Sequence, residues 1–296
     1  MIAGLGERVS RGEAIGENDA RLILDCKDLI AVGVAADTVR RRLHNARTTF
    51  VRVFEVHVDA PPAALPPRVS AGEIRIVGRP GSADVAISAV RAAAAIAGAV
   101  PVTGFSLVDL QALEGPATSA FAALCVSLRA AGLEAIAELP VDLLDAAGDA
   151  VDAARSAGIV LSRLTVHALF PADQIAVVTR ARDLQAALGG FRVFAPLPRT
   201  MSISTPSTGY DDVKQIALAR LLAANVESIQ VDWPLYGPKL AQFALTIGAD
   251  DVDGVAASDP GVLGTRRSPI EEIRGNIRSA ALEPVERNAR YEAIGQ

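Results

Sequence analysis

The side chains best suited to proton transfer fall at the ends of segments that are rich in β-branched and aromatic residues. Imidazole and carboxylate groups exchange protons near neutral pH, so such groups at segment ends are candidate catalytic acids and bases. The candidates, in chain order, are His57, Glu138, His167 and Asp232. Each also has a structural interpretation: a histidine at a strand end is often only hydrogen-bonded, and a carboxylate inside a barrel needs an ion-pair partner such as Arg75 or Arg163.

Other polar side chains follow the same segments and are suited to holding a ligand. We expect ligand-binding roles for Glu55, Arg75, Arg79, Thr103, Ser106, Arg199, Gln230 and Trp233. The set carries mixed charge, which suits a polar organic molecule with hydroxyl, amide or carboxylate groups. Trp233 beside Asp232 would allow one ring of such a molecule to be stacked and hydrogen-bonded at the same strand end.

The segments that carry these residues are predicted to be strands, because they are short, apolar and β-branched. The predicted strands are 48–59, 73–78, 100–105, 134–139, 161–170, 192–197 and 228–233. Six of them alternate with segments of helical period, which predicts parallel βα units. The number of units favours a TIM-type (β/α) barrel over an open sheet, and chemistry in such barrels lies at the C-terminal ends of the strands.

No break in composition divides the chain, so we expect residues 1–296 to form a single barrel domain. Residues 1–47 have helical periodicity and form a predicted N-terminal cap, while 48–254 form the barrel. Residues 255–296 are predicted to be a C-terminal helical tail, with its last helix near 269–288.

Composition excludes several classes of function. The net charge is −5, and Lys and Arg are scattered among Asp and Glu, so a nucleic-acid partner is not expected. The longest apolar run, 92–102, is too short to cross a membrane, and the N-terminus lacks a signal-peptide core. We therefore expect a soluble, cytoplasmic protein. The two cysteines, Cys26 and Cys125, lie far apart and outside any Cys/His cluster, so no metal site is predicted.

The acidic stretch GADDVDG contains Asp250, Asp251 and Asp253. A calcium loop needs oxygen ligands at regular offsets and usually a distal glutamate, which this stretch lacks. Gly248 would suit the end of a preceding helix. We interpret the stretch mainly as a structural turn, with ligand contact as the alternative.

Residues 191–254 contain a specific series of motifs: GGFRVFAPLPRT, TGYDDVK, an aromatic strand ending in Trp233, GPKLAQ and GADDVDG. In this order they resemble the C-terminal half of a radical-SAM subfamily that includes aminofutalosine synthase, dehypoxanthine futalosine cyclase and the deazaflavin (Fo) synthase subunits. AVGVAADTVRRRLHNARTTFVR resembles the N-terminal cap of that subfamily, and EPVERNARY its C-terminus. The resemblance implies a radical-SAM-like (β/α) barrel, partial or modified, and a place in the futalosine route to menaquinone.

One segment departs from the subfamily. There, the first strand leads into a CxxxCxxC loop and a helix, and the three thiolates hold a [4Fe–4S] cluster that activates S-adenosylmethionine. Here about fourteen proline-rich residues without cysteine separate the first two predicted strands. After the second strand, Arg79 follows Gly78 at a position where the subfamily tends to carry a glycine pair. The positive charge of Arg79 would oppose binding of the cationic sulfonium of S-adenosylmethionine. We therefore expect no cluster, no bound S-adenosylmethionine and no metal.

Three functions follow from this resemblance. The one we favour is a non-catalytic relative that binds a pathway intermediate or an active, cysteine-bearing sibling enzyme. The alternative is an enzyme that performs hydrolysis, isomerisation or dehydration on a futalosine-like or chorismate-derived molecule. The third is a radical enzyme that borrows its cluster from a partner. We also expect the 60–67 loop or another subunit to cover the outer face of the first strand, so a homo-oligomer is a further expectation.

Overall fold

The structure of the protein is a computed structural model that describes residues 2–67, 69–115, 118–144, 147–200, 208–258 and 270–295. The chain divides into two compact units, which are described separately below. Unit 1 comprises residues 1–50, 164–253 and 270–285, and unit 2 comprises 51–163, 254–269 and 286–296.

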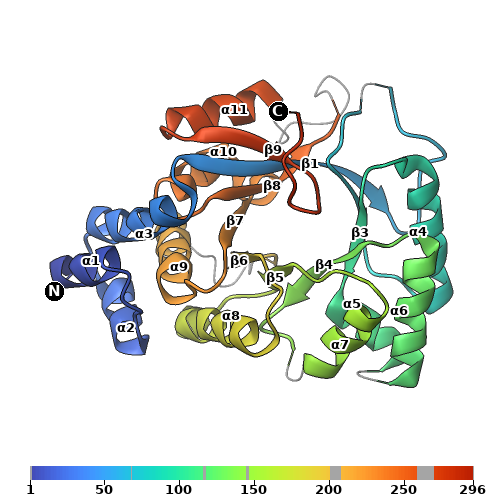
Figure 1. Ribbon diagram of the computed structural model, residues 1–296, viewed down its shortest axis with the longest axis horizontal. Coiled ribbons are helices and arrows are strands. Elements are labelled where there is room, and N and C mark those ends of the chain that lie inside the picture. The colour runs from blue at the N-terminus through green and yellow to red at the C-terminus, as the bar shows by residue number, and fades with distance from the viewer. Residues whose placement is uncertain are drawn as a thin grey trace. The chain divides into compact units, whose positions relative to one another are not determined.

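The strands form one sheet with the hydrogen-bonded order β2-β3-β4-β5-β6-β7-β8-β1-β9, and β1 also pairs with β2. This order closes strands β1 to β8 into the predicted (β/α) barrel (Figure 1). The strands are β1 (Arg47–His57), β2 (Glu73–Val77), β3 (Val102–Ser106), β4 (Ala135–Pro140), β5 (Arg163–Val166), β6 (Val193–Pro198), β7 (Ser228–Asp232), β8 (Asp251–Ala256) and β9 (Glu283–Arg287).

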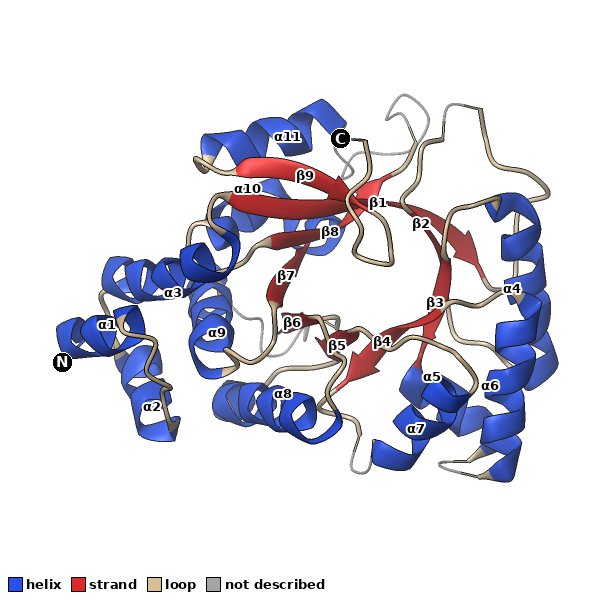
Figure 2. Ribbon diagram, in the orientation of Figure 1, coloured by secondary structure: helices blue, strands red, loops and turns tan. Residues whose placement is uncertain are grey.

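Unit 1 contains the helical cap that the sequence predicts, followed by the βα elements of the second half of the chain (Figure 2). Its helices are α1 (Ile2–Ser10), α2 (Glu17–Asp25), α3 (Leu29–His44), α8 (Gln174–Leu188), α9 (Gly209–Leu222), α10 (Trp233–Leu245) and α11 (Ile270–Ser279), with a short 3₁₀ turn at Pro171–Asp173. At the start of α9, Thr208 and Asp211 form a reciprocal capping box.

Unit 2 contains β2 to β4 and the helices that cover them. These helices are α4 (Ala83–Ala97), α5 (Leu107–Glu114), α6 (Ser119–Ala131) and α7 (Gly148–Ser156). The alanine-rich α4 packs against α6, which lies beside it in Figure 1. Small side chains allow this approach: a Cβ on Gly132, at the end of α6, would lie 2.7 Å from the Cβ of Ala94.

The connection between β1 and β2 has no helix in its described residues, 58–67 and 69–72. The strands are nevertheless parallel and adjacent, with Val53 opposite Glu73 and His57 opposite Val77. A parallel connection usually runs through a helix, so this crossover is unusually short. The sequence prediction that a helix is missing here is confirmed for the described residues.

The outer face of β1 is largely covered within unit 2. Residues directly opposite in a parallel pair share a face, so Val56 points away from the side shared by Glu55 and Arg75. The Val56 side chain is fully buried and Phe54, on the same face, is half-buried. The 58–72 connection is tied to β1 here, because Arg52 donates to the Ser70 hydroxyl over 2.9 Å.

Three elements differ from the sequence prediction. The stretch interpreted as a turn, GADDVDG, instead opens strand β8, with Asp251 opposite Gln230 and Asp253 opposite Asp232. The last helix ends at Ser279, and β9 occupies part of the predicted helical tail. An additional helix, α5, follows β3. Among the described residues, no helix has the length and apolar character needed to span a membrane.

Candidate functional site

In unit 2 the C-terminal strand ends bring together His57, Ser106 and Glu138 with the turn after β2. Ser106 and Glu138 are directly opposite each other on neighbouring parallel strands. Both side chains are half-buried. The predicted position of these residues at strand ends is therefore confirmed, and a hydroxyl and a carboxylate stand side by side on one face of the sheet.

His57 lies in an open position at the end of β1. Its side chain is 56% exposed, and Nδ1 lies 3.8 Å from a carboxylate oxygen of the exposed Asp59. Gly78, at the end of β2, has φ +95°, and a Cβ there would lie 3.3 Å from the imidazole ring and 3.0 Å from Val58. Position 78 therefore favours glycine for its backbone conformation, and a larger residue there would press on Val58 and the imidazole.

The end of β3 is strained. Phe105 is buried yet has φ +64°, a conformation that bulky residues rarely adopt. The preceding Gly104 allows a close approach to β2, because a Cβ there would lie 2.8 Å from the Cβ of Ile76. This backbone turns the chain directly into Ser106 and α5. Strain of this kind persists where the surrounding structure holds it, and it is common at ligand sites.

Arg79 does not line this strand-end group. Its side chain is 69% exposed, and Nε lies 3.3 Å from Asp109 of α5. An ion pair so open to solvent contributes little to stability.

Arg75 and Thr103 are also misplaced by the sequence prediction. Both are buried and both bind Glu73, the first residue of β2: Arg75 donates to its two carboxylate oxygens over 2.7 and 2.8 Å, and Thr103 donates over 2.5 Å. Glu73 belongs to the N-terminal strand ends, so this buried group lies at the stability face rather than the ligand face of the barrel fold. The sequence prediction did not include Glu73, because its candidates on this strand were chosen from the residues that follow Glu73 toward the C-terminal end.

In unit 1 the strand ends carry a second polar group. Arg199 follows β6 and donates to Asp232 over 2.6 Å, while its other terminal nitrogen lies 3.7 Å from Asp253. Asp232 also caps α10 by accepting from the backbone N–H of Leu235 over 2.8 Å. The predicted proximity of Arg199 and Asp232 to a strand end is confirmed. Because Asp232 is ion-paired and capping, it is poorly suited to act as a general base.

Gln230 lies on β7, two residues before Asp232. It is buried and donates to Asp251 over 2.6 Å, while the Thr49 hydroxyl donates to the other oxygen of Asp251 over 2.5 Å. Barrel interiors are usually filled by branched apolar residues, so buried carboxylates on β8 give this part an atypical polar lining. The sequence prediction did not identify Asp251 and Asp253 as lining residues, because it interpreted their segment as a turn. In a strand, residues two positions apart point to the same face, and a turn does not have this alternation.

Asp250 faces a different environment from the two aspartates that follow it. It forms a fully buried ion pair with Arg220 and lies 3.2 Å from His44 at the end of α3. Burial raises the pKa of Asp250, and burial lowers the pKa of Arg220. This pair joins α9, β8 and the cap helix, so its role is structural.

Trp233 and His167 differ in accessibility. Trp233 is fully buried in the core of unit 1, so the predicted stacking of a ligand ring on it is wrong for this structure. His167 is exposed, and its Nε2 lies 3.4 Å from the Thr200 hydroxyl. His57 and Glu138 belong to unit 2, and His167 and Asp232 to unit 1. The convergence of these four stays a prediction.

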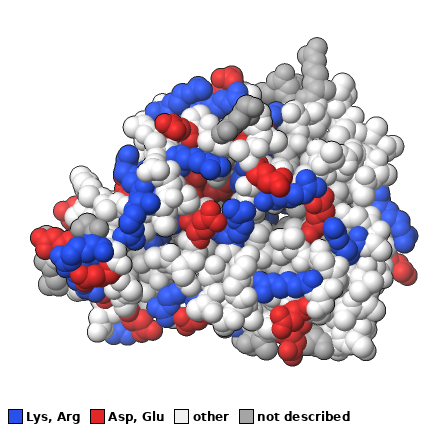
Figure 3. Space-filling view, viewed as in Figure 1, with Lys and Arg blue, Asp and Glu red and all other residues white. Residues whose placement is uncertain are grey.

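On the face shown in Figure 3, acidic and basic side chains are interspersed. This distribution agrees with the absence of a basic stripe in the sequence. A nucleic-acid site normally needs positive charge clustered on one face.

The comparisons with known proteins agree with the resemblance. The family described as "CofH/MqnC C-terminal region" matches residues 195–295. Aminodeoxyfutalosine synthase of Streptomyces coelicolor is 35% identical over 149 residues, which cover 43% of this chain and 38% of that protein. Cyclic dehypoxanthine futalosine synthase of the same organism is 32% identical over 131 residues, covering 42% and 33%.

A third relative is 5-amino-6-(D-ribitylamino)uracil–L-tyrosine 4-hydroxyphenyl transferase 1 of Methanosarcina barkeri. It is 30% identical over 167 residues, covering 49% of this chain and 44% of that protein. The matched segments thus span less than half of each curated relative.

Among solved structures, methylornithine synthase (PylB) aligns with a TM-score of 0.65 at 14% identity, over 95% of this chain and 97% of that chain. HydG, a maturase of the [FeFe]-hydrogenase, aligns with a TM-score of 0.64 at 15% identity, over 98% and 76%. At this level of identity the two alignments show the fold alone, and the predicted (β/α) barrel fold is confirmed.

The cysteines of the chain do not fit a three-thiolate cluster site. The chain has two, Cys26 in unit 1 and Cys125 in unit 2, and neither lies in the β1–β2 connection. Cys125 is buried on α6, and burial raises its pKa to about 11. A protonated thiol is not a metal ligand.

Proposed function

We propose that this protein binds an intermediate of the futalosine route to menaquinone, because residues 195–295 match the family described as "CofH/MqnC C-terminal region" and the chain folds as a (β/α) barrel. It does so without performing radical chemistry itself. The pathway comes from the two futalosine-related synthases among its relatives.

The observation that carries this proposal is the β1–β2 connection. It joins two adjacent parallel strands without a helix in its described residues and without a cysteine anywhere between His57 and Glu73. A radical centre needs thiolates to hold the cluster and a closed loop to shield the radical. This chain supplies neither at that position, while the barrel and its polar strand ends are retained.

The ligand in this proposal is a polar molecule held by strand-end groups. In unit 2 these are Ser106 and Glu138, which stand opposite each other. A hydroxyl and a carboxylate are groups that recognise ribose hydroxyls by hydrogen bonding. A cysteine-bearing sibling enzyme remains the proposed protein partner.

Calorimetric titration with aminodeoxyfutalosine and with dehypoxanthine futalosine tests the proposal. We expect saturable binding to at least one of them, and Glu138→Gln to weaken it roughly tenfold or more, because a hydrogen bond to a charged group contributes about 1.5–3 kcal/mol. Arg290→Ala is the matched control, since its exposed pair with Glu134 lies at the N-terminal end of β4.

Two results would contradict the proposal. If neither compound binds the wild-type protein, the pathway assignment is wrong. If the pure protein converts either compound into a product, the ligand site is instead an acid–base active site, and His57 and Glu138 become the first residues to substitute.

A further inference from the structure

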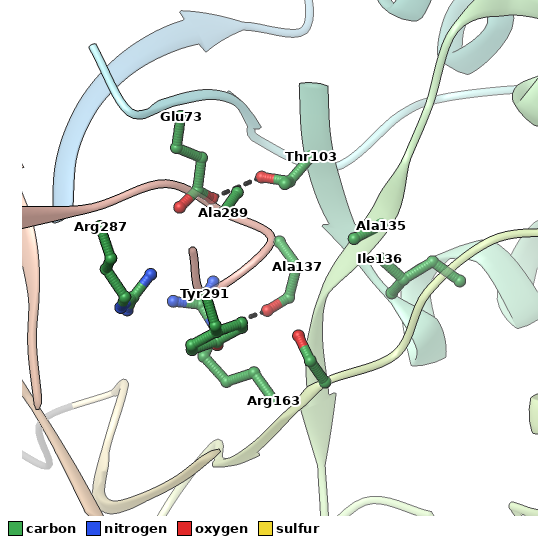
Figure 4. Close-up of a pocket in the computed structure, with 10 residues that line it drawn as sticks. Glu73, Thr103, Ala135, Ile136, Ala137, Arg163, Arg287, Ala289 and Tyr291 are labelled. Carbon is green, nitrogen blue, oxygen red and sulfur yellow. Dashed lines mark hydrogen bonds between the residues drawn. The ribbon is translucent and has the colours of Figure 1, made fainter. Parts of the chain in front are cut away.

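A small cavity in unit 2 lies at the beginnings of β2 to β5 (Figure 4). Its volume is about 20 Å³, which is room for one water molecule. Two of its lining residues, Ala289 and Tyr291, are half-buried and belong to the turn that follows β9. The other lining residues are buried: Glu73, Thr103, Ala135, Ile136, Ala137, Ser162, Arg163 and Arg287. This turn, residues 288–292, is therefore the part of the lining that separates the cavity from solvent.

The turn is organised by Asn288. Its side-chain oxygen accepts from the backbone N–H of Arg290 over 2.8 Å and from that of Glu292 over 3.1 Å. Its side-chain nitrogen donates to the Glu292 carboxylate over 2.8 Å. The chain then returns antiparallel to the end of β9, with Arg287 bridged to Ala293. Most of these hydrogen bonds lie within the turn itself, so it is a compact local unit at the end of the chain.

Two contacts fasten the turn to the strands. The backbone N–H of Ala289 donates to the backbone oxygen of Gly72, just before β2, over 3.0 Å. Arg290 forms a two-point ion pair with Glu134, just before β4, with both distances 2.8 Å. These two side chains are 45% and 29% exposed, so salt weakens their attraction. Segments fastened partly by solvent-accessible contacts open locally while the rest of a protein stays folded.

Tyr291 is held over the cavity in a strained conformation. Its φ is +63°, which bulky residues rarely adopt. Its ring centre lies 4.3 Å from the guanidinium carbon of Arg287, and Figure 4 shows Arg163 on the cavity side as well. Strain of this kind costs free energy in the closed state. Opening of the turn relieves that cost.

We propose that residues 288–292 form a gate that opens by local unfolding and lets water reach the polar cavity of unit 2. The Tyr291 ring closes the gate, and the Arg290–Glu134 pair latches it. Because salt weakens the latch, ionic strength regulates the fraction of open molecules. This inference goes beyond the proposed function, since Ser106 and Glu138 lie at the other ends of their strands and the gate does not depend on the pathway ligand.

A thiol placed in the cavity reports on the gate. Ser162 lines the cavity and is 7% exposed, so Ser162→Cys introduces a thiol that iodoacetamide reaches only when the gate opens. Peptide mapping gives its alkylation rate, with Cys26 as the accessible internal reference. We expect the rate to rise about threefold as salt is raised to about 1 M, where the Debye length is about 3 Å. Hydrogen exchange should be faster for the amides of 288–294 than for those of β3 and β4.

Three further substitutions separate the latch from the ring. Arg290→Ala should speed both the alkylation at position 162 and the exchange of the turn by about threefold, and should remove the salt effect. Tyr291→Gly should speed only the alkylation, because glycine accepts the positive φ while the ring is lost. Arg79→Ala is the matched control: it removes another exposed ion pair of unit 2 and should change neither rate.

Two results would overturn the gate. One is alkylation at position 162 that responds neither to salt nor to the substitutions at Arg290 and Tyr291. The other is alkylation that occurs only as fast as the amides of β3 and β4 exchange, because the cavity would then open only when the strands unfold. If Ser162→Cys does not fold, hydrogen exchange of the wild-type protein decides: a turn that exchanges no faster than β4 is not a gate.

Discussion

Arg199 donates to Asp232 over 2.6 Å where β6 and β7 end, and the same guanidinium lies 3.7 Å from Asp253 on β8. One cation thus links two carboxylates from neighbouring strands, side by side in register. This arrangement places a cation beside each of two acidic residues in the barrel lining. It also defines the first prediction.

Replacing Arg199 with methionine should destabilise the protein by about 1–3 kcal/mol, because removing one partner of a part-buried ion pair leaves the carboxylates beside it without that cation. Urea unfolding measures this. The double variant Arg199→Met/Asp232→Asn should recover part of the loss, since asparagine removes the part-buried charge and still caps α10. A loss below about 0.5 kcal/mol in the single variant would mean that the pair behaves like an exposed surface pair.

Gly78→Ala should destabilise the protein by about 1–2 kcal/mol, because the positive φ is unfavourable for alanine. The new Cβ would also lie 3.3 Å from the His57 ring and should shift its NMR resonances. The matched control is Gly81→Ala in the same connection, where no heavy atom lies within 4 Å of the added Cβ. Equal stability of the two variants would show that the close approach at His57 is not a constraint.

The first two cap helices should loosen in acid. Arg8 donates to Asp19 over 2.8 Å, and this hydrogen bond holds the pKa of Asp19 below its ordinary value of 3.8. A carboxylate with a lowered pKa contributes stability above its unfolded pKa and loses it as pH falls through the folded pKa. Amide hydrogen exchange of α1 should therefore quicken, relative to α4, as pH falls below about 4.

Asp19→Asn should remove most of that pH dependence while leaving the rest of the exchange pattern intact. If the wild-type protein and this variant respond to acid in the same way, the Arg8–Asp19 pair does not hold the cap.

The two cysteines should differ in reactivity. Burial raises the pKa of Cys125 to about 11, so its thiol stays protonated at pH 8, whereas Cys26 is partly accessible. Intact mass after iodoacetamide treatment should therefore show one adduct on the folded protein and two in denaturant. Rapid alkylation of Cys125 in the folded protein would contradict the burial of α6.

The strands and helices were predictable where apolar periodicity is strong. β1 to β7 appear close to their predicted positions, because each is a run of branched residues that the barrel buries. β8 was missed because its buried residues include Asp251 and Asp253, whose partners Gln230, Thr49 and Arg199 lie elsewhere in the sequence. No local pattern reveals that an aspartate is stabilised by a residue 200 positions away.

The candidate site was predictable only in part. Ser106, Glu138, Arg199 and Asp232 lie at the expected strand ends. Trp233 was expected to meet a ligand but is buried in the core, because the first turn of a helix can point an aromatic ring in either direction. Arg75 and Thr103 were assigned to the wrong end of their strands, since their shared partner Glu73 lies at the beginning of β2.

The most direct test of the central claim is native mass spectrometry of the protein isolated anaerobically from its own cells. The account predicts a chain that carries a small molecule with the mass of a futalosine-route intermediate, or a bound sibling chain, and no increment of four irons and four sulfides. A [4Fe–4S] increment on this chain alone would contradict the account, as would an empty monomer that binds none of the pathway compounds when they are added.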